Sequence, residues 1–168
     1  MSKTAKVAII MGSDSDYPVL ESCIATLKKF GVETEMMVCS AHRTPEKAAA
    51  FARNAEADGV DVIIAAAGKA AHLPGVLAAF TVLPVIGLPI KSSTLDGLDS
   101  LLSIVQMPSG IPVATVAING SENAALLAIQ IMGGAYPELR SAMHEYKQSM
   151  AEAVEEKDRR LKEKLRGL

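Results

Sequence analysis

Short apolar runs rich in β-branched residues alternate with helix-length segments along this chain, and the alternation constrains the fold more than any other feature. Most of these runs are apolar at successive positions, which is typical of strands buried on both faces of a sheet. The pattern therefore predicts an α/β fold, a parallel sheet of about five strands covered by helices on both sides. The predicted strands are residues 6–11, 32–38, 60–67, 83–89 and 111–118.

Proline and glycine mark where two of the intervening helices begin and end. Pro18 fits the first turn of a helix that Gly31 would stop. Thr44 and Pro45 form a cap and first turn for an alanine-rich helix that reaches Gly59. Each of these helices joins two predicted strands, as a parallel sheet requires.

Two further helices predict contact with another chain. Residues 123–135 are apolar almost all round, which suggests burial on every side. The helical extension from about residue 137 to 165 would be roughly 43 Å long, against about 30 Å for a small domain. We expect it to overhang its domain and pack on a neighbour, although a frayed, charged tail after Val154 is the alternative. The sequence thus predicts a homo-oligomer, mainly from the apolar helix.

Composition narrows the class of protein. The 168 residues show no linker or repeat, so we expect one domain over 1–168. A net charge of −2 leaves no basic excess to attract nucleic acid. The first apolar run, at 7–11, is too short for a signal peptide or a membrane span. Cys23 and Cys39 fit neither a disulfide framework nor a metal spacing, so we expect a reduced, cytoplasmic protein.

Polar motifs follow three predicted strands directly, where an open parallel sheet binds its ligands. The first is GSDSD at residues 12–16, which leads into a helix N-terminus. Backbone N–H groups there, with the hydroxyls of Ser13 and Ser15, could hold a phosphate or a ribose. Serine and aspartate are also the usual capping residues, so capping of the helix is the alternative interpretation.

The second motif is SAHRTP at residues 40–45. Arg43 could clamp a phosphate with two parallel hydrogen bonds, and Ser40 could donate a third. His42 is suited to carrying a proton near neutral pH. A solvent-exposed loop would account for the same residues without any function.

The third motif is GKAAHLPG at residues 68–75. Gly68 would let the backbone approach a ligand closely, and Lys69 and His72 supply the polar side chains. A metal site would need a third ligand, and two histidines on separate loops are weak grounds for one, so we predict no metal. His72 could instead simply bond a backbone carbonyl.

Taken in order, these motifs resemble the N5-carboxyaminoimidazole ribonucleotide mutases of purine biosynthesis, the class I PurE family. The resemblance implies a three-layer αβα, flavodoxin-like fold and a homo-octamer with active sites near subunit interfaces. It also implies a small ribonucleotide substrate and no metal or other cofactor. The matching segments, from Val7 to about Met132, are MGSDSD, SAHRTP, AGKAAHLPG, SIVQMPSGIPVATVAI and NAALLAIQI.

The resemblance also implies roles for individual residues. His42 matches the essential acid/base, Arg43 should face the phosphate, and Asp16 suits the ribose hydroxyls. The loop that begins at Gly68 should lie against the base and its carboxylate. The substrate-binding positions implied in this way are Ser13, Asp16, Ser40, Arg43, Gly68, His72 and Leu73, and we add Lys69 from the same loop.

The implied reaction interconverts N5-carboxyaminoimidazole ribonucleotide and 4-carboxy-5-aminoimidazole ribonucleotide. The family is thought to release carbon dioxide from the substrate nitrogen, trap it, and let ring carbon 4 attack it. One histidine can protonate the departing amine and later remove the ring proton. The alanine- and leucine-rich loop at 70–73 is consistent with the dry pocket that trapping requires.

Lys69 departs from the family pattern, which usually has a second glycine there. Class II enzymes, which carboxylate aminoimidazole ribonucleotide with free carbon dioxide, often have a basic residue at this position. His72, Leu73 and Pro74 match class I. The sequence therefore predicts a class I mutase, with a class II carboxylase as the alternative.

A flavodoxin-like module that binds FMN is an alternative of another class, with GSDSD as its phosphate loop. Such modules usually stack the flavin on tryptophan or tyrosine. The chain has no tryptophan and three tyrosines, of which only Tyr17 lies near a motif. This composition disfavours the flavin interpretation.

Overall fold

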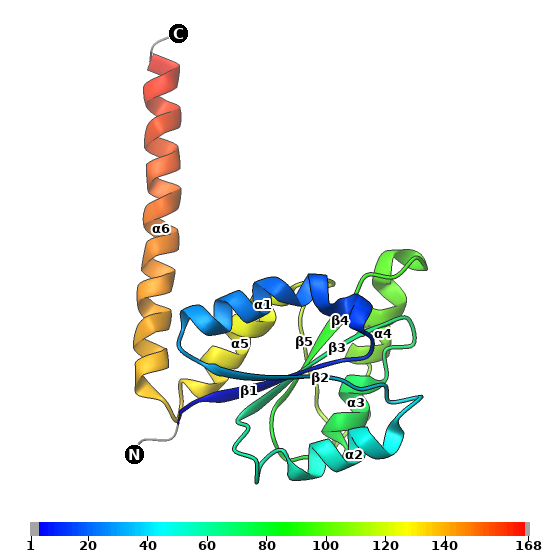
Figure 1. The fold of residues 1–168 in the computed structure, drawn as a ribbon. Coiled ribbons are helices and arrows are strands. Elements are labelled where there is room, and N and C mark those ends of the chain that lie inside the picture. Colours follow the sequence, from blue (N-terminus) through cyan, green and yellow to red (C-terminus); the bar gives the residue numbers. More distant parts are fainter. Residues whose placement is uncertain (1–3, 167–168) are drawn as a thin grey trace.

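The computed structural model describes residues 4–166 and contains one five-stranded parallel sheet. The strand order β2-β1-β3-β4-β5 is that of flavodoxin-like folds and confirms the predicted class. Figure 1 shows the sheet between two layers of helices. The strands are β1 (Lys6–Met11), β2 (Glu33–Val38), β3 (Val62–Gly68), β4 (Val85–Ile90) and β5 (Ala114–Thr115).

The helices divide between the two faces of the sheet. One apolar cluster contains residues of α1, α5 and α6, and a second contains residues of α2, α3 and α4. The short helices α3 and α4 are additional to the predicted elements. The helices are η1 (Asp14–Asp16), α1 (Tyr17–Lys29), α2 (Pro45–Asn54), α3 (Leu73–Ala78), η2 (Leu95–Gly97), α4 (Leu98–Val105), α5 (Ser121–Met132) and α6 (Pro137–Arg166).

The central strands supply both clusters because successive side chains point to opposite faces. In β1, Val7 and Ile9 enter the cluster under α1 and α5, whereas Ala8 and Ile10 enter the cluster under α2 and α3. These four side chains are fully buried. Burial on both faces explains why the central strands are continuously apolar.

Of the two edge strands, β2 forms over nearly the predicted range, whereas β5 is much shorter than predicted. Of the predicted strand at 111–118, only Ala114 and Thr115 pair with β4. Pro112 has no N–H to donate to a ladder, so the approach to the edge stays irregular. In β2, Met36 and Val38 are almost half exposed, because the strand has a neighbour on one side only.

Helix α5 is buried on one face rather than on every side. Ala124, Ala128 and Ile129 are fully buried against the sheet and α1. Asn123 and Gln130 are exposed. Within a single chain, α5 is therefore buried on one side only, and the predicted burial of its other side would require a second chain.

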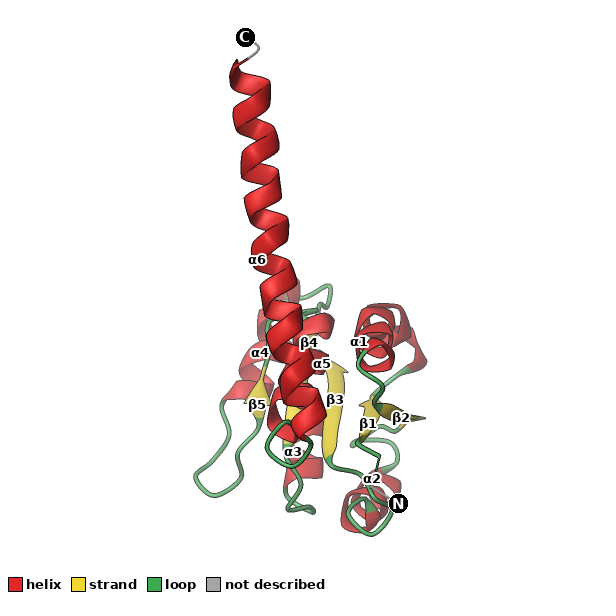
Figure 2. Ribbon diagram, turned by 90° about the vertical axis from the view of Figure 1, so that its left-hand side faces the viewer, coloured by secondary structure: helices red, strands yellow, loops and turns green. Residues whose placement is uncertain are grey.

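Helix α6 forms over the predicted range and projects far beyond the sheet (Figures 1 and 2). Leu139 and Met143 pack in the core, and the helix continues without a break to Arg166. The frayed tail after Val154 is therefore not what the structure shows. No helix within residues 4–166 is both long and apolar enough to cross a membrane.

We predict that Gly87→Ala destabilises the protein by about 1–3 kcal/mol, the usual cost of overpacking a core. Helix α4 lies so close to β4 that a Cβ at Gly87 would overlap Ile104 and come within 2.9 Å of Val113 Cγ1. Alanine would otherwise be favoured over glycine in a strand. Urea unfolding of the two proteins measures the difference.

The control is Gly134→Ala, whose new Cβ would meet its nearest atom, Ile131 O, at an ordinary 3.6 Å. We expect this variant to stay within about 0.5 kcal/mol of the parent. Equal stability of the Gly87→Ala variant and the parent would contradict the close approach of α4.

Candidate active site

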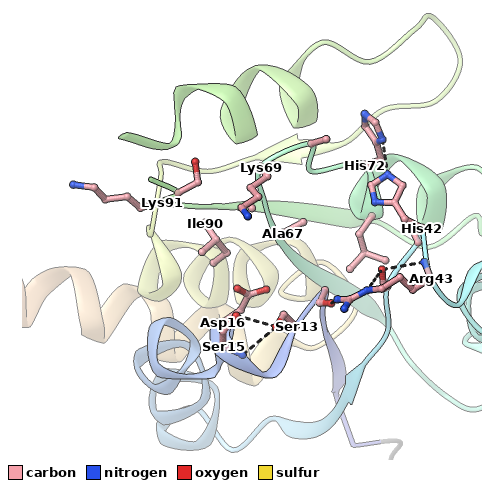
Figure 3. Close-up of a pocket in the computed structure, with 17 residues that line it drawn as sticks. Ser13, Ser15, Asp16, His42, Arg43, Ala67, Lys69, His72, Ile90 and Lys91 are labelled. Atoms are coloured by element: carbon pink, nitrogen blue, oxygen red, sulfur yellow. Dashed lines mark hydrogen bonds between the residues drawn. The ribbon is translucent and has the colours of Figure 1, made fainter. Parts of the chain in front are cut away.

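The loops that follow the first four strands surround one cleft at the carboxyl edge of the sheet (Figure 3). The cleft has a volume of about 610 Å³. The structure thus brings every site residue expected from the sequence into one place. These residues are Ser13, Asp16, Ser40, His42, Arg43, Gly68, Lys69, His72 and Leu73.

The loop after β1 turns tightly into η1. The Ser13 hydroxyl accepts a hydrogen bond from the Ser15 backbone N–H at 3.3 Å, and the two hydroxyl oxygens lie 2.9 Å apart. Ser13 is therefore a helix cap, as the alternative interpretation expected. Capping does not remove it from the cleft, which both serines line.

Asp16 is the acidic group of the cleft, and only 8% of its surface is exposed. Burial raises the pKa of this carboxyl, and the nearby charge of Asp14 raises it further. Hydrogen bonds from Ser13 and Ser15 act in the opposite direction and limit the rise in the pKa. The carboxylate is thus held ready to accept hydrogen bonds from a ligand.

The loop after β2 is closed by Thr44, whose hydroxyl donates to Ser40 O at 2.9 Å and accepts from Ser40 N at 3.0 Å. Arg43 then reaches back across the cleft, where its Nη2 lies 3.4 Å from Gly12 O and its Nε 3.5 Å from Ser40 Oγ. Both acceptors are neutral and both distances are long. The guanidinium is therefore suited to exchange these bonds for shorter ones to an anion.

The two histidines of the cleft are in direct contact. His42 Nε2 lies 2.8 Å from His72 Nδ1, with the rings inclined at 74° (Figure 3). One nitrogen must donate and the other must accept, since two N–H groups cannot point at each other across this distance. One proton lies in this contact, so one ring acts as the donor and the other as the acceptor.

Lys69 has a φ of 56°, in the left-handed region that few non-glycine residues adopt. Glycine takes this conformation without cost, which explains why the family that the sequence resembles usually has glycine there. Figure 3 shows the Lys69 ammonium group pointing into the cleft toward the side where Asp16 lies. A strained backbone thus presents a cation to the site.

Lys91 and Ser92 also line the cleft, directly after β4, and the sequence prediction omitted them. The signal was present, because a polar KSST segment follows the fourth predicted strand just as the other motifs follow theirs. The Lys91 ammonium group pairs with Asp96 at 3.2 Å, so Arg43 and Lys69 are the two cations that remain for a ligand, against the single carboxylate of Asp16. The balance of charge favours an anionic ligand.

Apolar side chains complete the inner wall of the cleft. Ala67, Ala70, Leu73 and Ile90 line it beside the polar groups. Within residues 4–166 there is no cluster of three or more histidine, cysteine, aspartate or glutamate side chains that could hold a metal ion. The arrangement offers an anion anchor and a proton-carrying pair.

The sheet order and the cationic cleft at its carboxyl edge define a flavodoxin-like α/β protein suited to a small anionic ligand. The model of the AIR carboxylase family matches residues 6–153, and the chain belongs to that family. The match contains every strand and every loop of the cleft.

Named relatives resemble the chain over nearly its whole length. The N5-carboxyaminoimidazole ribonucleotide mutase of Pyrococcus horikoshii is 59% identical over 162 residues, covering 96% of this chain and 92% of the relative. The protein of the same name from Thermotoga maritima is 56% identical over 158 residues, covering 94% and 92%. The crystal structure of Treponema denticola PurE has a TM-score of 0.86 at 34% identity, covering 94% of this chain and 98% of that one.

We predict that Asp16→Asn stabilises the ligand-free protein at neutral pH. The folded-state pKa of Asp16 is raised, so folding favours its protonated form, and stability is lost as the pH rises through that pKa. Asparagine removes this loss. We expect the thermal midpoint at pH 7 to rise by up to about 2–4 °C, the shift that 1 kcal/mol produces in a domain of this size.

The matched control is Asp14→Asn, which changes the same charge at an exposed position two residues away. The difference in thermal midpoint between the Asp16→Asn variant and the parent should shrink as the pH falls. At low pH Asp16 is protonated, so position 16 is neutral in both proteins. A midpoint that drops at pH 7 would show that the ionised carboxylate stabilises the fold.

Proposed function

We propose that the chain is an N5-carboxyaminoimidazole ribonucleotide mutase, which forms 4-carboxy-5-aminoimidazole ribonucleotide in purine biosynthesis. The observation that carries this proposal is the name borne by relatives 59% and 56% identical over nearly the whole chain. The cleft supports it, because it combines an anion anchor with a proton-carrying histidine pair.

In this proposal the substrate phosphate binds Arg43 and the serine hydroxyls of the loop after β1. Arg43 already lies over Gly12 O at 3.4 Å, so its guanidinium reaches the mouth of that loop. Asp16 accepts hydrogen bonds from the ribose hydroxyls, and Ser40 adds a contact beside Arg43. The base then lies toward Gly68, Lys69, His72 and Leu73, on the other side of the cleft.

The chemistry is a transfer of one carboxylate and one proton. The bond between the carboxylate carbon and the exocyclic nitrogen breaks, carbon dioxide leaves, and His42 protonates the nitrogen. Ring carbon 4 then attacks carbon dioxide, and His42 removes the proton from that carbon. His42 gives one proton to the nitrogen and takes one from carbon 4, so it returns to its starting protonation state. The reaction is therefore a balanced isomerisation that requires no oxidant, reductant or cofactor.

Carbon dioxide must stay in the cleft between the two steps. The apolar side chains of Ala70, Leu73 and Ile90 form a wall against which a small neutral molecule can rest without competing for hydrogen bonds. His72 contacts His42 at 2.8 Å and holds its ring in place while the proton moves.

A class II carboxylase remains the second candidate because of Lys69, whose cation could help to hold an incoming bicarbonate or carbon dioxide. A flavin site has less support. Among the described residues that line the cleft, none is phenylalanine, tyrosine or tryptophan, so a flavin ring would have no aromatic surface on which to stack.

We also propose that the protein works in the cytoplasm as a homo-octamer, without nucleic acid or membrane partners. Large apolar side chains that are exposed in the single chain support an assembly, because water-exposed patches of this kind usually mark interfaces. They include Leu98, Leu102 and Val105 on α4 and Ile131 on α5, each between 37% and 47% exposed.

The test of function uses unlabelled carboxyamino ribonucleotide in isotopically labelled bicarbonate, without ATP or metal. A mutase keeps the carboxylate of its substrate, so we expect little label in product collected early. Product labelled to the level of the medium, or faster conversion from aminoimidazole ribonucleotide plus bicarbonate, would assign the carboxylase activity instead. A Lys69→Gly variant shows whether that side chain sets the preference.

We predict that His42→Asn lowers turnover by about 10²–10⁴, the usual contribution of a general acid/base, while ribonucleotide still binds. His144→Asn is the control, because His144 is exposed on α6 outside the cleft. Turnover of the His42 variant close to that of the control would remove His42 from the mechanism.

A further inference from the structure

The outer half of α6 presents a surface that its own chain does not cover. From residue 147 to residue 166 every position except Glu156 is exposed. Figures 1 and 2 both show this part of the helix standing clear of the sheet and its covering helices. At 1.5 Å per residue, it is about 30 Å long.

One side of this segment is apolar. Met150, Val154, Leu161 and Leu165 are exposed by 44%, 63%, 56% and 58%. With 3.6 residues per turn, the four positions fall within about 60° around the helix, so they form one stripe. We call these four residues the apolar stripe.

The ion pairs of the segment lie mainly away from the apolar stripe. Glu156 pairs with both Arg159 and Arg160, on the opposite side of the helix. Asp158 and Lys162 pair along one flank at 2.5 Å. Exposed pairs of this kind contribute little to stability, and none of them shields the apolar stripe from water. The stripe is therefore suited to a partner with a matching apolar face.

Charge along the segment determines which partner orientation fits. Residues 152–158 contain four carboxylates and one lysine, whereas residues 159–166 contain five cations and one carboxylate. Two parallel copies would set like charges side by side. Two antiparallel copies would set the acidic half of each against the basic half of the other, which is the complementary arrangement.

The apolar stripe has the symmetry that an antiparallel pair needs. Its four positions are symmetric about the midpoint between residues 157 and 158. An antiparallel pair centred there sets Met150 opposite Leu165 of the second copy and Val154 opposite Leu161 of the second copy. All four apolar side chains of each helix are then covered at once.

We infer that the outer half of α6 pairs antiparallel with the same segment of a second copy of this chain, through the apolar stripe. Met150 also lines a groove of about 520 Å³ between α5 and α6, together with Leu126, Leu127 and Tyr146. In this register Leu165 of the second copy lies at the mouth of that groove, which extends the apolar contact onto the domain.

The test introduces cysteines at Val154 and Leu161 and measures disulfide-linked dimer under mild oxidation. In the antiparallel pair these positions face each other, so the double variant should give mainly linked dimer and each single variant little. The two positions of one helix are about 10.5 Å apart, too far to bridge each other. The native Cys23 and Cys39 are buried, and burial raises the pKa of Cys23 to about 12, which keeps it unreactive.

Each outcome decides the inference. Strong linking in both single variants would mean a parallel pair, and no linking in any variant would mean no pairing of these segments; either result overturns the proposal. Linking requires no turnover, so the result is independent of the catalytic proposal.

A second experiment introduces negative charges into the apolar stripe and measures the mass of the assembly. Val154→Glu combined with Leu161→Glu should lower the average mass found by light scattering. Ala153→Glu, at an exposed position about 90° from the centre of the apolar stripe, should leave the mass unchanged. An unchanged mass in the double variant would count against the pairing.

Discussion

The parallel pairing of β1 with both β2 and β3 is the constraint on which the site depends. Because all these strands point the same way, the loops after them must emerge at one edge. His42 and His72 are 30 positions apart in the chain, yet their nitrogens lie 2.8 Å apart because each follows a strand that flanks β1. The alternating burial of β1 fixes the register that makes this contact possible.

The electrostatic character of the cleft depends on the positions of its cationic side chains and of its one carboxylate. The cations of Arg43 and Lys69 come from two different loops, and that of Lys91, from a third, is paired with Asp96. The single carboxylate, Asp16, is buried at the start of α1. Burial raises the pKa of Asp16. Arg43 and Lys69 outnumber this one carboxylate, so the cleft is positive on balance. A phosphorylated ligand would satisfy the cations and leave Asp16 free to bind neutral hydroxyl groups.

Much of the fold could be predicted because the central strands are apolar at every position and Pro18 and Pro45 mark helix starts. The edge strand β2 could be predicted too, but the length of β5 could not, since only Ala114 and Thr115 of the predicted run pair with β4. Short helices such as α3 leave too little periodicity to detect. The site residues could be chosen from their place after strands, but the contact of the two histidines and the backbone of Lys69 depend on tertiary packing.

The left-handed backbone at Lys69 restricts what this position can become. A β-branched residue would be strongly disfavoured there, while glycine would relieve a conformational cost of roughly 1–2 kcal/mol. A change to glycine would therefore strengthen the fold and remove a cation from the cleft in the same step. The residue at position 69 therefore affects both the thermal stability of the fold and the charge of the cleft. A substitution there that changes one of these properties also changes the other.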